Sequence, residues 1–127
     1  MQGVPSTSVD IHEDGKKILS EISKFTDIPI KNLWLLSAVL GKREGRKSPI
    51  QQRENVTKLT NLDDIAISII ISLYDKGDVP PSFLEAVKVA EEYAAVGVYI
   101  LYNKFNTDKK NFIDNLAAEF MMFRKGG

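Results

Sequence analysis

The stretch from residue 82 to residue 105, SFLEAVKVAEEYAAVGVYILYNKF, indicates the fold class of this 127-residue chain. Ser82 and Glu85 form a capping-box pair, which predicts the start of a helix. Apolar side chains then recur at spacings of three and four, so a helix over about 83–104 should bury one face. Gly97 lies on that face and costs about 1 kcal/mol of helix propensity. We therefore expect another helix to approach closely at Gly97.

Apolar stripes with helical spacing recur elsewhere in the chain. They run over residues 18–25, 30–40, 62–73 and 112–121. The stripe at 30–40 has almost no polar face, so this helix should be central, and Gly41 is expected to end it as a left-handed cap. The run IAISIII at 65–71 also suits a buried strand, which stays the alternative for that segment.

Five helices and little strand signal predict an all-α fold. The expected architecture is a compact single domain of about five helices, with a short extended segment possible near residues 55–59. Residues 1–12 are polar, contain Pro5 and lack periodicity, so we expect a flexible N-terminal tail. Residues 13–125 should then form the single helical domain.

Composition excludes several classes of function. The chain has 17 basic and 17 acidic residues and no cysteine, which argues against thiol catalysis, zinc ribbons and iron–sulfur sites. His12 is the only histidine and precedes a predicted helix, so we expect no metal and no cofactor. No apolar stretch reaches the length of a membrane span. The sequence therefore predicts a cytoplasmic protein that is not an enzyme and does not enter a membrane.

Positive charge is concentrated in residues 40–58, LGKREGRKSPIQQRENVTK. Gly45 and Pro49 break helical geometry there, which predicts a loop. Arginine and lysine side chains on such a loop could bind phosphates, with Ser48 and backbone amides assisting. The candidate anion-binding or DNA-binding residues are Lys42, Arg43, Arg46, Lys47 and Arg53. A solvated basic loop, or a loop whose cations pair with acidic residues of the same chain, remains the alternative.

Several short motifs also occur in a characteristic order between residues 28 and 105. They are Leu40–Gly41, the basic stretch from Lys42 to Pro49, Gly77–Asp78, the sequence EEYA at 91–94, Gly97 and Ile100–Leu101. This order resembles a family of small proteins encoded beside DNA phosphorothioation (Dnd) systems, the Dnd-associated proteins of the fourth type. The family pattern continues EEYA with Asn-Gly-Gly, where this chain has Ala95, Val96 and Gly97.

The resemblance implies a setting in prokaryotic DNA modification and anti-phage defence. Such a protein would be a non-enzymatic accessory component that contacts the DNA backbone or a Dnd-system protein through the loop 42–53. Two alternatives remain: a pure protein–protein adaptor or oligomerisation module without DNA contact, and a small DNA-binding regulator. Apolar residues beyond one core, including Met122 and Phe123, make a homo-oligomer a further expectation.

Overall fold

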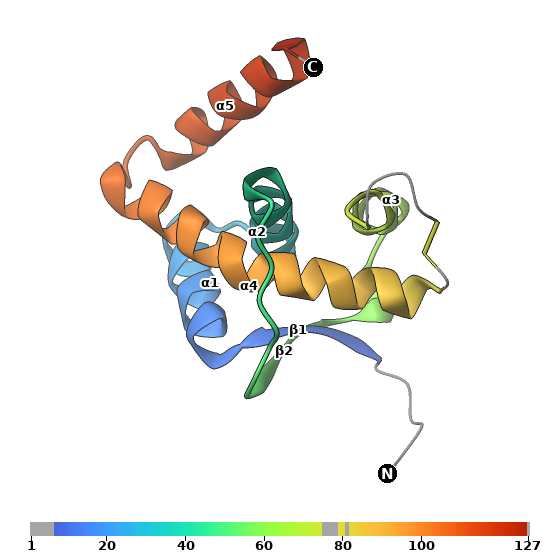
Figure 1. Cartoon of the computed structure of the whole chain (residues 1–127). Helices are drawn as coiled ribbons and strands as arrows, with labels where there is room; N and C mark the ends of the chain where they lie inside the picture. Colours follow the sequence, from blue (N-terminus) through green and yellow to red (C-terminus); the bar gives the residue numbers. More distant parts are fainter. Residues whose placement is uncertain (1–6, 75–78, 81, 127) are drawn as a thin grey trace.

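The structure, a computed structural model, describes residues 7–74, 79–80 and 82–126, and residues 120–126 by their backbone alone. Within these residues the chain forms five α-helices, a 3-10 turn and two β-strands (Figure 1). In chain order the elements are β1 (Ser8–His12), α1 (Glu13–Thr26), α2 (Ile30–Glu44), β2 (Arg53–Lys58), η1 (Leu59–Asn61), α3 (Asp64–Ser72), α4 (Phe83–Thr107) and α5 (Phe112–Gly126).

The long helix α4 spans the molecule, and α2 crosses it (Figure 1). Two glycines lie where the two helices meet. A Cβ atom at Gly97 would overlap the carbonyl oxygen of Ser37 in α2. A Cβ at Gly41 would overlap the carbonyl oxygen of Tyr93 in α4. The close approach expected at Gly97 is confirmed, because only a residue without a side chain fits at either position.

The predicted end of α2 at Gly41 is wrong. The helix continues to Glu44, and Gly45 takes the left-handed position with φ of 70°. Gly41 serves helix packing, whereas Gly45 caps the helix with its own N–H bonded to the carbonyl of Lys42 at 3.0 Å. A glycine in sequence suits both roles, so the pattern alone assigned the cap one turn too early.

The expectation of a flexible tail over residues 1–12 is wrong for its last five residues. Ser8–His12 form β1, which pairs antiparallel with β2. Val9 and Ile11 are fully buried, and the polar residues Ser8, Asp10 and His12 that alternate with them are only partly buried. This period-two pattern is short enough to resemble an irregular polar segment.

The strand pair also corrects the fold class. The extended segment expected near 55–59 is present as β2, and its partner β1 makes a two-stranded sheet whose register shifts between Val9 and Asp10. The chain is therefore helix-dominated but not all-α. The helical interpretation of 65–71 is confirmed, since these residues lie in α3, whose N-cap Asp63 accepts the N–H of Ala66 at 2.8 Å.

Helix α4 has a second buried line besides its α2 face. Glu91, Ala95 and Val98 recur on this side and are all buried, whereas Tyr99 beside them is exposed. Ser82 caps the helix as predicted, with its hydroxyl accepting the N–H of Glu85 at 3.2 Å. The motif Gly77–Asp78 and the side chains of Met122 and Phe123 lie outside the described residues.

Candidate functional site

The basic stretch is divided among three elements of structure. Lys42 and Arg43 lie in the last turn of α2, Arg46 and Lys47 lie in the following loop, and Arg53 begins β2. The loop lies against α4, because the N–H of Ser48 donates to the carbonyl of Glu92 at 3.0 Å.

Lys42 and Lys47 meet at one aromatic ring. Their ammonium nitrogens lie 5.2 and 5.7 Å from the ring centre of Tyr93, which is almost fully buried. Such cation–π contacts stabilise a charge weakly where solvent reaches it. Lys42 also donates to the carbonyl oxygen of Tyr74, just past α3, at 3.5 Å. The structure thus brings these two predicted residues together.

Arg43 faces a different direction and helps to hold α5. Its guanidinium pairs with the Glu119 carboxylate at 3.1 Å, and Lys104 of α4 pairs with the same carboxylate at 2.9 Å. The hydrogen bond from Lys104, followed by that from Arg43, holds the pKa of Glu119 below its ordinary value. Glu119 therefore links the middle of α5 to the C-terminal ends of α2 and α4.

Arg53 belongs to a network between the sheet and α4. Its guanidinium lies 3.0 Å from Glu91 and 3.3 Å from Asp10. Glu91 is only 3% exposed and also accepts the backbone N–H of Asp10 at 2.8 Å. Burial raises the pKa of Glu91, and the bonds from Asp10 and Arg53 oppose that shift. Arg53 acts here as the cation that allows a carboxylate to be buried.

Arg46 differs from the other four residues. It is exposed, and no ion pair joins it to any residue in the part of the chain that the structure describes. The five cations predicted to form one anion site therefore lie in three environments. Arg53 and Arg43 pair with acidic side chains, and Lys42 and Lys47 lie at Tyr93. Arg46 is exposed.

A polar pocket of about 450 Å³ lies beside this loop. His12 Nε2 and the Tyr99 hydroxyl are 2.8 Å apart across it, and Gln51 and Gln52 form another wall. Gln52 adopts a left-handed backbone with φ of 52°. Burial lowers the pKa of His12, with Asp14 opposing the shift, so the imidazole is neutral near pH 7. No local pattern in the sequence pairs His12 with Tyr99, 87 positions away.

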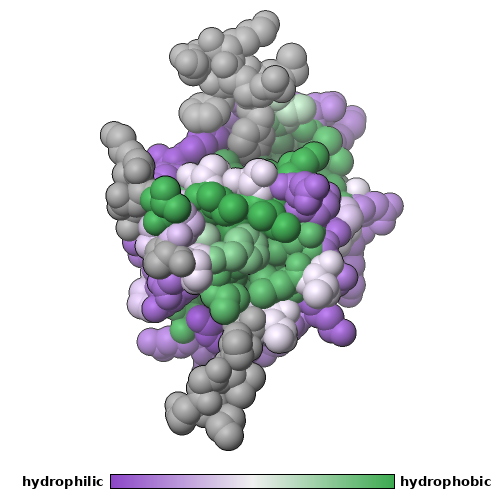
Figure 2. Space-filling view, turned by 90° about the vertical axis from the view of Figure 1, so that its right-hand side faces the viewer, coloured by the Kyte–Doolittle hydropathy of each residue, from purple (hydrophilic) through white to green (hydrophobic). Residues whose placement is uncertain are grey.

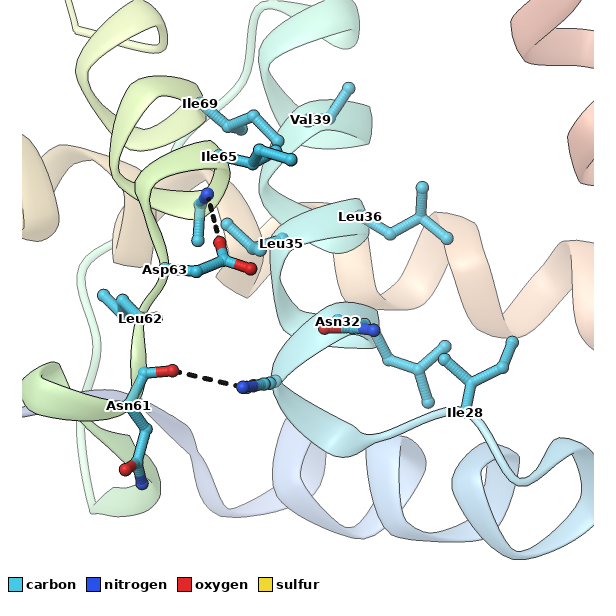
Figure 3. Close-up of a pocket in the computed structure, with 13 residues that line it drawn as sticks. Ile28, Asn32, Leu35, Leu36, Val39, Asn61, Leu62, Asp63, Ile65 and Ile69 are labelled. Carbon is cyan, nitrogen blue, oxygen red and sulfur yellow. Dashed lines mark hydrogen bonds between the residues drawn. The ribbon is translucent and has the colours of Figure 1, made fainter.

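A second concavity is an apolar groove of about 480 Å³ between α2 and α3. Figure 3 shows side chains of α3 reaching across it toward α2. Its apolar wall is formed mainly by Leu35, Leu36, Val39, Ile65, Ala66 and Ile69. Its polar lining residues are Lys31, Asn32, Asn61 and Asp63, and Lys31 Nζ donates to the carbonyl of Asn61 at 3.1 Å.

The groove belongs to a larger apolar area on the side of the molecule that carries α3. Figure 2 faces this side and shows hydrophobic residues gathered within a hydrophilic frame. Ile65 is 72% exposed and Ile71 is 44% exposed. The nine-residue helix α3 carries isoleucine on every side, so one core cannot bury all of these side chains. The sequence predicted an apolar helix here but not the groove, because a groove requires the relative position of two helices.

Comparison with protein-family models, with curated proteins and with solved structures finds no match for the chain. Among the described helices, none has both the length and the apolarity that a membrane span requires. Across the same residues, no group of three or more His, Cys, Asp or Glu side chains could hold a metal ion. The geometry of the two concavities and of the basic loop is therefore the basis for a functional proposal.

Proposed function

We propose that this protein is a non-enzymatic binding module that holds an amphipathic helix of a partner protein in the groove between α2 and α3. The observation that carries the proposal is that Ile65, which lines this apolar groove, is 72% exposed. Burying a side chain of this size contributes about 1.5–3 kcal/mol. An amphipathic helix presents apolar residues at i, i+3 or i+4 and i+7, the pattern that fits a groove between two helices.

The groove is a better candidate contact than the basic loop. Four of the five predicted cations already have partners within the molecule: Lys42, Arg43, Lys47 and Arg53. Recruiting Arg53 to an external anion would leave Glu91 buried without its cation, which is costly. The groove, in contrast, offers apolar area that gains free energy when it is covered. Resemblance to Dnd-associated proteins suggests a component of a DNA-modification system as the partner, which stays a prediction.

A selection of helical peptides from a random display library tests the proposal. Bound peptides should share apolar residues at helical spacing. They should also protect the backbone amides of 28–39 and 61–69 from hydrogen exchange. Peptides that protect other segments, or a selection that yields no helical binder, would contradict it.

DNA contact through the loop is a second candidate, favoured by one observation. Lys42 and Lys47 place two ammonium groups near the same ring, and the exposed Arg46 directly precedes Lys47 in the chain. Such a small cluster would engage few phosphates, so binding should weaken with salt.

Fluorescence anisotropy with a labelled duplex at low salt tests this second function. The variant Arg46→Ala/Lys47→Ala should lose binding, whereas Lys17→Ala, an exposed cation on α1, should retain it. Equal binding by both variants, or no binding by the unaltered protein, would leave the groove as the sole proposed contact.

A further inference from the structure

Helix α5 has one face packed on its own molecule and another face exposed. Phe112 and Leu116 are buried, and the Phe112 ring packs edge-on against Phe105 of α4 with centres 5.3 Å apart. Ile113 is 51% exposed, and Ala117, one turn further on, is exposed as well. Residues four apart share a side of a helix. Helix α5 therefore presents an apolar line that its own molecule leaves uncovered.

Contacts at its base hold α5 away from the groove of its own chain. Figure 1 shows α5 projecting from the end of α4. The paired bonds of Glu119 to Arg43 and Lys104 fix its direction. Folding α5 back over α2 and α3 would break these bonds and expose Phe112. In this arrangement the exposed line of α5 is available to another molecule.

We propose that α5 of one copy docks in the α2–α3 groove of a second copy, so that the chain forms a two-fold dimer by reciprocal exchange of this helix. This inference rests on the proposed function and names the helix. Each copy has one donor helix and one acceptor groove, so two such contacts close the assembly. The 15-residue helix α5 is about 22 Å long.

The two surfaces match in chemistry. Ile113 can contact Ile65 and Val39, and the small Ala117 lets the helix backbone approach closely. Asp114, exposed beside Ile113, offers a carboxylate that suits Lys31 at the edge of the groove. The exposed apolar surfaces of donor and acceptor would then be removed from water together.

Sedimentation velocity of the full chain between about 1 and 100 µM tests the proposal, since association depends on concentration. We expect a dimer, and we expect Ile113→Lys and Ile65→Lys each to weaken it at least about tenfold. Ile71→Lys is the matched control on α3, because Ile71 is exposed but lies outside the groove. Asn115→Lys serves as the control on α5. Circular dichroism of each variant checks that it is folded.

Mixing two variant chains distinguishes this dimer from a dimer formed through other surfaces. A mixture of the Ile113→Lys chain and an Ile65→Glu chain should form a heterodimer. One of its two contacts keeps Ile113 against Ile65, and the other pairs the introduced lysine with the introduced glutamate. Because the chain has no cysteine, Ile113→Cys and Ile65→Cys on separate chains should form a disulfide on oxidation, whereas Ile71→Cys should not. Formation of this disulfide supports the exchange.

Two results would overturn the inference: a monomer at every concentration, and a dimer that tolerates Ile65→Lys. A monomer whose groove still binds selected helical peptides overturns this inference alone and leaves the proposed function standing. A groove that binds no helical peptide overturns both.

Discussion

At the scale of single residues, two glycines determine how closely the central helices pack. The carbonyl oxygens of Ser37 and Tyr93 occupy the space that a Cβ would fill at Gly97 and Gly41. The N atom of Gly41 would itself lie 2.7 Å from a Cβ at Gly97. Backbone, unlike a flexible side chain, cannot move aside locally, so any substitution must separate the helices.

Gly97→Ala should therefore destabilise the protein despite the better helix propensity of alanine. We expect a loss of at least about 3 kcal/mol, at the upper end of the cost of overpacking, measured by urea denaturation. Gly45→Asn is the control, because no described atom lies within 4 Å of its Cβ position and asparagine tolerates a left-handed backbone. Equal stability of Gly97→Ala and the unaltered protein would show that α2 and α4 do not cross as described.

Removal of the Arg53 cation should expose the cost of burying Glu91. Arg53→Met is expected to lose about 1–3 kcal/mol near pH 7, less than a fully buried pair would lose because Arg53 is 47% exposed. Since burial already raises the pKa of Glu91, the penalty applies when the carboxylate is ionised. Stability lost at neutral pH should therefore be regained as pH falls through the raised pKa toward the ordinary value.

Urea denaturation at about pH 5 and about pH 7.5 measures this difference. Lys88→Met provides the control, because Lys88 is exposed, lines the same surface and forms no ion pair with any described residue. A loss that is the same at both pH values would mean that Arg53 acts through packing of its stem rather than through Glu91.

At the scale of elements, helices were predictable and the strand at the N-terminus was not. The stripe from Phe83 to Phe105 specifies α4 because periodicity over seven turns leaves little ambiguity. Ser8–His12 offer only two apolar residues, and their burial depends on β2, more than 40 positions away. A strand this short is specified by its partner, which a local pattern does not contain.

Strand β1 should accordingly be essential for stability. Ile11→Ala is expected to cost about 2–4 kcal/mol, because Ile11 is fully buried, and thermal denaturation measures the change. Thr7→Ala, at an exposed position just before the strand, should be neutral within about 0.5 kcal/mol. If Ile11→Ala caused no loss of stability, residues 8–12 would be an unpaired tail as the sequence predicted.

At the scale of the whole molecule, the candidate sites depend on how elements are placed. The basic residues were evident from composition, but their partners Glu91 and Glu119 come from α4 and α5 and could not be inferred from spacing. The apolar excess of α3 was visible in the sequence as the run IAISIII at 65–71. Its position opposite α2, which makes the groove, follows only from the fold.

The central claim is that the groove between α2 and α3 binds a helix. The most direct measurement is the dissociation constant of a selected helical peptide for three forms of the protein, by fluorescence anisotropy. We expect binding to Ile65→Lys to be at least about tenfold weaker than to the unaltered protein, and binding to Ile71→Lys to change less than about twofold. Equal affinity for all three forms, or equal weakening by both substitutions, would contradict the claim.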